Sequence, residues 1–186
     1  MKNNLHRKIL QHISLWTAAS LTVSGLFADS TTYAAETSKL QKADVVDLAS
    51  QKAMTLALYN EIQTTNALSV VSLVNQERHK AGLKPLTMHT NLTKMAKEKT
   101  EDMYNHNYFS HTSPIFGSPF DMMDRYQISF EYAGENLAKG QQTPAEVVKD
   151  WMNSPGHKAN ILNPHYTLIG VGYYNGYWSE EFIGKR

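Results

Sequence analysis

Apolar residues recur at helical spacing in two stretches near the middle of the chain. In the first, Leu68, Val71 and Val74 lie three residues apart and Gly82 follows as a stop, which predicts a helix over residues 67–81. The second stretch predicts a helix over residues 91–104, with one buried face. Thr90 precedes it as the expected N-cap. The expected buried positions of this second helix are Leu92, Met95, Ala96, Lys99 and Met103.

Two later segments carry the sequence pattern of capped helix starts. Ser118 followed by Pro119 predicts a short helix that runs to about Tyr126. Thr143, with Glu146 three residues later, forms a capping-box pattern. The helix that begins there should carry Val147, Val148 and Trp151 and end at the break Ser154-Pro155-Gly156, after which His157 begins the next helix.

The C-terminal part changes to the pattern of strands. Residues 168–174 and 177–183 flank Asn175-Gly176, a dipeptide that readily adopts positive φ and is a strong hairpin signal. Residues 134–138 fit a further strand of the same sheet. Helices come first and strands mostly late, without regular alternation, so the order favours an α+β layered fold over a doubly wound one.

The N-terminal 35 residues resemble an export signal. Lys2, Arg7 and Lys8 precede an apolar run over residues 13–28, and small residues ending in Ala34-Ala35 follow. Cleavage is expected after Ala34 or Ala35, and the alternative is an uncleaved membrane anchor. We therefore divide the chain into a signal peptide (1–35), a helical linker (36–65) and one domain (66–186). No stable membrane span is expected after cleavage.

Composition limits the classes of function. The 186 residues, 41% of them hydrophobic, suffice for one ordinary domain with an extension. The net charge is +1, and because residues 1–35 carry +2, the remainder carries −1. No basic surface is implied, so nucleic acid is not an expected partner. The absence of cysteine fits an exported bacterial protein that folds without disulfides.

His157 is a candidate site residue from its local context alone. It follows a Pro-Gly break at the start of a helix, where backbone N–H groups are still unpaired. Such a position suits an anion or a metal-bound ligand. The alternative is that the imidazole only caps the turn.

Four linked motifs resemble the CAP superfamily of cysteine-rich secretory proteins, antigen 5 and the plant pathogenesis-related class. They are Phe109-Ser110-His111, Gly134-Glu135-Asn136-Leu137-Ala138, Trp151-Met152-Asn153-Ser154-Pro155-Gly156-His157 and Ile169-Gly170-Val171-Gly172. The chain is similar to the bacterial, SCP-like extracellular branch over residues 66–186. The resemblance implies an α-β-α sandwich with a central antiparallel sheet and a cleft lined by two His and two Glu.

Carried over by motif, the cleft residues are His111, Glu135 and His157. Eukaryotic relatives have a Glu three residues after the helix Trp, where this chain has Ser154, which puts an intact set of four in doubt. Asn136 either orients Glu135 or satisfies a turn. Similar proteins have been proposed to bind divalent metal through the His pair, to bind sterols or other lipids, or to cleave peptides.

Two hypotheses follow. Two neutral imidazoles and one carboxylate suit Zn²⁺ or another divalent cation. In the first hypothesis, the site binds metal, with His111 and His157 as ligands, and recognises a cell-envelope component, a lipid or a host or surface protein without chemistry. The lack of a second Glu favours this hypothesis, because acid-base catalysis usually needs a pair of titrating groups. In the second, the protein is a metal-assisted hydrolase of peptide or ester bonds, with Glu135 as general base or third ligand.

Other residues carry weaker chemical signals. No nucleophile-elbow pattern surrounds the serines that lie close to histidines in the sequence. We expect His89, His106 and His165 on the surface or in loops. The aromatic residues of the C-terminal hairpin are expected to belong mainly to the core.

Overall fold

The computed structural model describes residues 30–185. The chain forms two compact units, residues 1–50 and 51–186, and each is described by itself. Residues 30–50, the described part of the first unit, are helical. The predicted export signal lies almost wholly outside the described residues. Among the described helices, none is both long and apolar enough to cross a membrane.

Helix α2 (Ser30–Lys80) confirms the helix predicted over residues 67–81 but begins much earlier. The expected linker helix and the expected domain helix are therefore one element. The helix ends two residues before Gly82, whose φ of +74° matches the predicted stop. Within the second unit, the buried face of α2 includes Ala67, Val70 and Val74.

Helix α3 (Thr90–Asn105) buries all five predicted positions, Lys99 included. The prediction of Thr90 as its cap is wrong by one residue. His89 has extended backbone angles and its Nδ1 accepts the Leu92 N–H at 3.3 Å, so the imidazole satisfies one of the unpaired donors of the first turn.

The other predicted helix starts are confirmed. Helix α4 (Pro119–Arg125) begins with a capping box between Ser118 and Asp121, and α5 (Pro144–Asn153) with one between Thr143 and Glu146. Helix α6 (Pro155–Ile161) follows the break at Ser154 and carries His157 in its first turn.

Four strands form one sheet in the order β1-β3-β4-β2. They are β1 (Thr87–Met88), β2 (Tyr132–Lys139), β3 (Leu168–Tyr174) and β4 (Tyr177–Gly184). The three long strands are antiparallel as expected, and β3 and β4 form the predicted hairpin, with positive φ at Asn175 and Gly176. The short β1 pairs parallel with β3, so the sheet is mixed rather than purely antiparallel.

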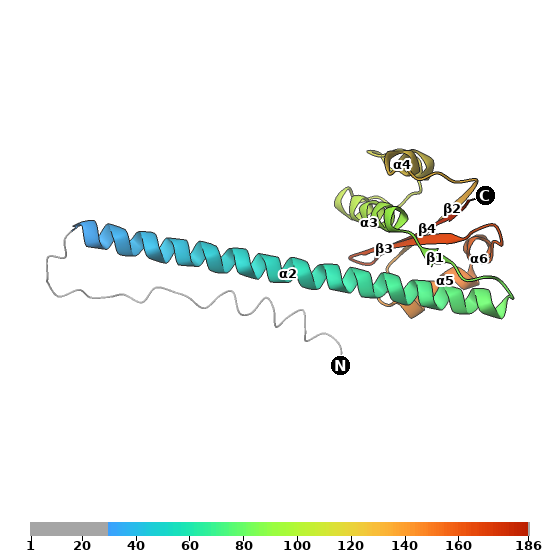
Figure 1. The fold of residues 1–186 in the computed structure, drawn as a ribbon, viewed down its shortest axis with the longest axis horizontal. Coiled ribbons are helices and arrows are strands. Elements are labelled where there is room, and N and C mark those ends of the chain that lie inside the picture. The colour runs from blue at the N-terminus through green and yellow to red at the C-terminus, as the bar shows by residue number, and fades with distance from the viewer. Residues whose placement is uncertain (1–29, 186) are drawn as a thin grey trace. The chain divides into compact units, whose positions relative to one another are not determined.

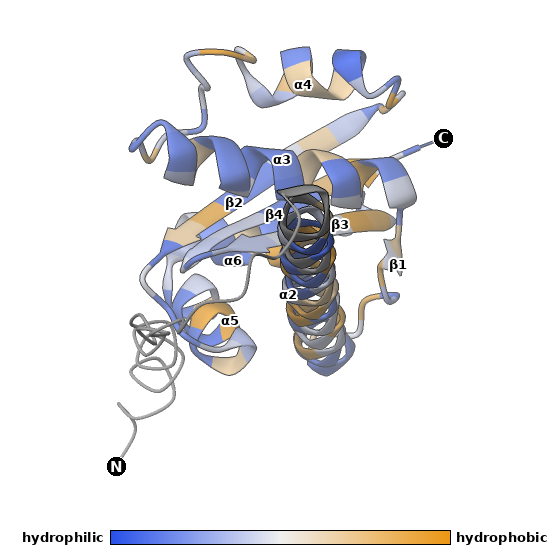
Figure 2. Ribbon diagram, turned by 90° about the vertical axis from the view of Figure 1, so that its left-hand side faces the viewer, coloured by the Kyte–Doolittle hydropathy of each residue, from blue (hydrophilic) through white to orange (hydrophobic). Residues whose placement is uncertain are grey.

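The second unit is an α-β-α sandwich. Helices α3 and α4 cover one face of the sheet, and α5, α6 and the C-terminal part of α2 cover the other (Figures 1 and 2). Successive side chains of β4 point to opposite faces of the sheet and contribute to both core layers. Trp178 and Phe182 pack on the α5 side, and Ile183 packs with Leu92 of α3. The fold is therefore the expected α+β class.

Two glycines of β3 let α3 lie directly on the sheet. A Cβ atom at Gly170 would collide with Leu92, and one at Gly172 would collide with the backbone of Ala96. Only glycine permits this close approach of helix and strand. The glycines of the sequence motif Ile169-Gly170-Val171-Gly172 thus have a packing role.

Arg78 of α2 connects this helix to the end of α6 through buried hydrogen bonds. Its side chain is buried, and its guanidinium donates to the carbonyl oxygens of Ile161 at 2.8 Å and Asn163 at 2.9 Å. Further bonds reach the carbonyls of Lys84 and Tyr166. The guanidinium therefore satisfies carbonyls at the end of α6 and in the segment that follows.

Candidate functional site

His111 and Glu135 form the centre of the candidate site. His111 Nδ1 lies 2.5 Å from Glu135 Oε1. The His111 side chain is 59% exposed, whereas the Glu135 side chain is only 3% exposed. A buried carboxylate thus orients an exposed imidazole through Nδ1, and the second ring nitrogen, Nε2, is left for an outside group.

The segment that carries His111 is anchored on α3. Lys99 Nζ donates to the His111 carbonyl at 2.6 Å. Asp102 accepts bonds from Ser113 Oγ at 2.7 Å and from the Tyr108 hydroxyl. Two buried polar residues of one helix therefore hold both sides of the histidine, which reduces its freedom to move away from Glu135.

Asn136 connects the two sides of the site. Its Nδ2 donates to the His157 carbonyl and to Glu180 Oε2, both at 3.1 Å. Its Oδ1 accepts from Asn160 Nδ2 at 2.8 Å. All hydrogen-bonding groups of this buried amide are thus used, and they tie helix α6 to strands β2 and β4.

Side chains occupy the outer edge of β2, the edge strand of the sheet that carries Glu135 and Asn136. The carbonyl of Ala133 accepts from the Tyr166 hydroxyl at 2.9 Å, that of Glu135 from Asn160 Nδ2 at 3.2 Å, and that of Leu137 from Trp151 Nε1 at 3.2 Å. In an edge strand, alternate carbonyls point away from the neighbouring strand. These three side chains donate the hydrogen bonds that a further strand would otherwise supply to those carbonyls.

His157 is half-buried in the first turn of α6. Burial lowers the pKa of its imidazole, and the nearby His111 lowers it further. Both effects favour the neutral form of the imidazole. Its main chain rather than its ring makes the bond to Asn136.

Ser154 is positioned by backbone bonds between α5 and α6. Its N–H donates to the Trp151 carbonyl, and its carbonyl accepts from Lys158. As the N-cap of α6 it makes no side-chain capping bond. The structure gives Ser154 a helix-junction role and shows no bond from its hydroxyl to the other predicted site residues within residues 30–185.

Four buried ionisable residues beside the site were not predicted as site residues: Lys99, Asp102, Glu180 and Glu181. Glu181 pairs with Glu135 across strands β4 and β2. Burial raises the pKa of both carboxyl groups, and Lys99 partly offsets that rise. The sequence does contain a signal for Glu180 and Glu181, since the two acids stand next to each other inside the apolar strand Tyr177–Gly184. Burying such acids is costly unless they are protonated or paired, so they could have been identified as special.

The donor set fits a metal ion only in part. Among residues 30–185, no group of three or more His, Asp or Glu side chains is arranged to hold a metal ion. Glu135 lies behind His111, in the position of an orienting carboxylate. Two imidazoles are therefore the protein's available ligands, and solvent or a bound molecule has to complete the coordination of a cation such as Zn²⁺.

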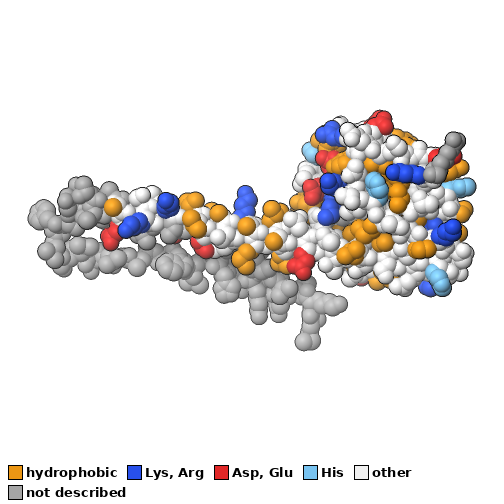
Figure 3. Space-filling view, in the orientation of Figure 1, with side chains coloured by type: hydrophobic (Ala, Val, Ile, Leu, Met, Phe, Trp, Pro, Cys, Tyr) orange, Lys and Arg blue, Asp and Glu red, His pale blue; other side chains and the backbone are white. Residues whose placement is uncertain are grey.

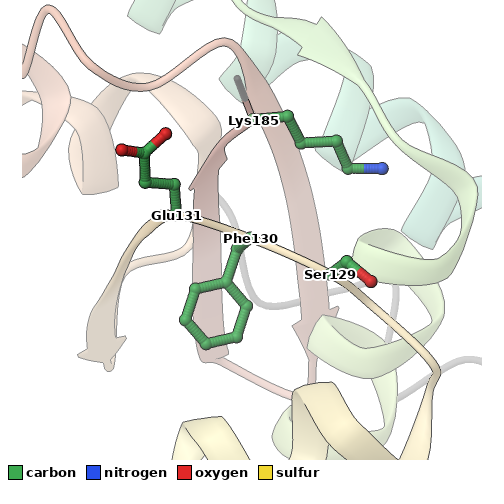
Figure 4. Close-up of a pocket in the computed structure, with 4 residues that line it drawn as sticks. All are labelled: Ser129, Phe130, Glu131 and Lys185. Carbon is green, nitrogen blue, oxygen red and sulfur yellow. The ribbon is translucent and has the colours of Figure 1, made fainter.

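A pocket of about 420 Å³ lies elsewhere on the second unit. Ser129, Phe130, Glu131 and Lys185 line it, and none of these is a predicted site residue. Glu131 and Lys185 extend in different directions (Figure 4). The pocket therefore lacks the convergent polar groups of a typical small-molecule site.

On the face shown in Figure 3, charges of both signs are interspersed over this unit.

Three further histidines, His89, His106 and His165, were expected on the surface or in loops. His106 ends α3 and its Nδ1 lies 2.8 Å from Asp102 Oδ1, while exposed His165 stacks on Tyr132. His89 is partly exposed in the loop before α3, so the expectation of surface or loop positions is confirmed for all three. Tyr177 and Trp178 of the hairpin are buried, as expected for core residues.

Comparisons with known proteins identify relatives of this chain. The model of the cysteine-rich secretory protein family, CAP, matches residues 71–183. A protein of Bacillus subtilis named as uncharacterized protein YkwD is 58% identical over 118 residues, which cover 62% of this chain and 46% of that protein. An uncharacterized membrane protein of the same species, YlbC, is 36% identical over 75% of this chain and 40% of its own length. This chain thus spans less than half of either relative.

Solved structures show the same fold. An extracellular protein containing an SCP domain from Bacillus anthracis has a TM-score of 0.67 at 33% identity, over 68% of this chain and 42% of that chain. An outer surface protein from Borrelia burgdorferi has a TM-score of 0.57 at 28% identity, over 62% of this chain and 90% of its own. These similarities agree with the sandwich described above.

Proposed function

Because this chain belongs to the cysteine-rich secretory protein (CAP) family, we propose that it is an exported bacterial binding protein. Its binding site is formed by His111, Glu135 and His157. The site binds a divalent cation, an extracellular ligand, or both, and catalyses no reaction. Cell-wall material, a lipid or a surface protein is the expected class of ligand.

The hydrogen bond between His111 and Glu135 carries this proposal. It fixes an exposed imidazole from behind with a buried carboxylate. Such second-shell bonds set the tautomer and orientation of metal-binding histidines in proteins. With Nδ1 protonated toward Glu135, the lone pair of Nε2 faces outward and is ready to bind a cation or accept a hydrogen bond.

His157 supplies the second imidazole. Its lowered pKa keeps it neutral at physiological pH, which is the form that binds metal. The bond from Asn136 to its carbonyl ties the first turn of α6 to the strand that carries Glu135. A bound Zn²⁺ would add a positive charge and open coordination positions for an oxygen ligand.

Related structures support an extracellular location. The Bacillus anthracis relative is described as extracellular and the Borrelia burgdorferi relative as an outer surface protein. The export signal predicted from residues 1–35 and the absence of cysteine agree with this location. The ligand is therefore sought among components of the cell envelope or its surroundings.

A second candidate function is metal-assisted hydrolysis of peptide or ester bonds. The observation in its favour is the buried carboxyl of Glu135, whose pKa is raised toward the range useful for a general base or acid. In this function, the histidines hold the metal and Glu135 transfers the proton of an attacking water. The Nδ1 bond to His111 already uses one oxygen of Glu135, which is why we prefer the binding role.

Calorimetric titration of Zn²⁺ into the purified protein tests the proposal. We expect binding in the micromolar range or tighter that is lost in His111→Ala and in His157→Ala. His165→Ala is the matched control, because His165 is an exposed histidine whose ring stacks on Tyr132. Binding that persists in both site variants would contradict the proposed metal ligands.

A panel of wall peptides and esters, with Zn²⁺ supplied and then removed by chelator, separates the two functions. Turnover that disappears with chelator and in His111→Ala would establish the hydrolase. Zinc binding without turnover supports the binding role.

A further inference from the structure

Glu181 lies directly across from Glu135 in the sheet. The two residues are paired in the antiparallel register of β2 and β4, which places their side chains on the same face of the sheet, next to each other. Both are buried, and Glu181 has no exposed surface at all. Two ionised carboxylates in such a place would repel each other without water to screen them.

The hydrogen bonds around this pair leave one donor missing. Ser179 Oγ donates to Glu181 Oε1 at 2.6 Å, and His111 Nδ1 contacts Glu135 Oε1. Glu135 Oε2 and Glu181 Oε2 are both buried and have no partner. Ionised carboxylates only accept hydrogen bonds, so neither can satisfy the other. One proton shared within the pair supplies the missing donor.

Other charged groups nearby do not replace that proton. Lys99 is the cation that acts on both carboxyl groups, and its Nζ donates to the His111 carbonyl. Asp102 of α3 adds a further negative charge and is held by Tyr108 and Ser113. Glu180, the neighbour of Glu181 in sequence, points to the opposite face and bonds to Asn136.

We propose that Glu181 is a second carboxyl group of the site, protonated in the resting protein, which donates a hydrogen bond to Glu135 and holds it in place against His111. It is a positioning residue, since it acts on a bound ligand only through Glu135 and His111. This role rests on the proposed function. Glu181 would thus supply the second carboxyl group of the site from strand β4. In the family pattern described above, the second carboxyl group belongs to a Glu at the position of Ser154.

The proton is assigned to Glu181 for two reasons. Glu181 is completely buried, and both burial and the facing Glu135 raise its pKa well above the ordinary value. Glu135 contacts the His111 ring through Oε1 at 2.5 Å, and an ionised oxygen makes the stronger bond to an imidazole N–H. Within the pair, the bond from Glu181 favours the ionised form of Glu135.

The test uses NMR of the full chain with ¹³C-labelled Glu carboxyl groups and ¹⁵N-labelled His. Glu181→Gln retains a neutral donor of similar shape, and Glu181→Leu removes the donor. Glu98→Gln is the control, because Glu98 is a glutamate of α3 that bonds to Tyr126 rather than to a residue of the site. Zinc titration of the same variants gives a second readout.

We expect the Glu181 carboxyl to show the signal of a protonated acid at pH 7, with His111 in its Nδ1–H tautomer. Glu181→Gln and Glu98→Gln should retain that tautomer and a zinc affinity within about twofold of the native protein. Glu181→Leu should lose the tautomer, raise the pKa of Glu135 and weaken zinc binding about tenfold or more, as removal of second-shell partners does.

The inference is overturned if Glu181 titrates near the ordinary value for glutamate, or if Glu181→Gln disturbs His111 as much as Glu181→Leu does. The native protein and Glu181→Gln suffice for this decision should Glu181→Leu fail to fold. If zinc binds to none of these proteins, the proposed metal function fails, while the NMR signals still decide the role of Glu181.

Discussion

Lys99, buried in helix α3, donates a hydrogen bond of 2.6 Å to the backbone carbonyl of His111. Burial raises the pKa of the Glu135 and Glu181 carboxyl groups, and the same ammonium group offsets part of that rise. One lysine therefore holds the histidine segment and offsets part of the negative charge beneath it. The core of the domain and its candidate site are thus energetically connected.

Replacing Lys99 by Met should keep most of the packing but remove both effects. We expect the free energy of unfolding to fall by about 2–4 kcal/mol, because a charge-assisted bond is lost and buried carboxyl groups lose their cation. Urea denaturation measures the change. Lys94→Met, at an exposed position on the same helix, should have little effect, and an equal loss in both variants would contradict this role.

Arg78→Met should destabilise the protein by about 3–5 kcal/mol. The substitution leaves the carbonyls of Ile161, Asn163 and Tyr166 without their buried donor. Arg78→Lys should recover only part of the loss, because one ammonium cannot reproduce the planar fork of donors. Lys80→Met is the control, since Lys80 is exposed at the end of the same helix. Thermal and urea unfolding should agree in rank order.

Glu180→Gln should stabilise the protein at neutral and higher pH. Burial raises the pKa of Glu180 to about 8, so the folded protein retains a proton that the unfolded chain releases above its ordinary pKa of about 4.3. Native stability therefore falls as pH rises from that value to about 8. We expect the variant to gain about 1–3 kcal/mol at pH 7 and nothing near pH 4. A gain of equal size at both pH values would refute this explanation.

His111→Ala should raise the pKa of His157. Burial is the larger cause of the low pKa of His157 and remains in the variant, whereas the electrostatic effect of His111 is removed. The increase should therefore be partial, and NMR titration of the His157 ring protons measures it. In His165→Ala the His157 titration should be unchanged, because burial and His111 are the causes of its low pKa.

Local sequence signals predicted most of the secondary structure correctly. Thr143 with Glu146 and the dipeptide Asn175-Gly176 act through bonds or angles within a few residues, so their structural result can be read from the sequence. The cap of α3 was missed because His89 is an unusual capping residue. The parallel pairing of β1 depends on where the chain returns over the sheet, which local signals do not contain.

The candidate site was predicted less completely because tertiary structure assembles it. His111 and Glu135 were identified through sequence motifs, but their direct bond depends on a segment anchored to α3 by Lys99 and Asp102. Glu181 was missed because alternation in a strand normally places an acid toward water. Both faces of β4 are covered in this fold, so both of its adjacent acids are buried.

The side-chain donors along the outer edge of β2 also affect how the protein assembles. A bare edge strand is a template for another chain, and its pairing leads to domain swapping or fibres. In this protein, Tyr166, Asn160 and Trp151 already occupy the outward carbonyls of Ala133, Glu135 and Leu137. Side-chain donors therefore already engage these three carbonyls, which reduces the backbone that β2 offers to a strand of another molecule.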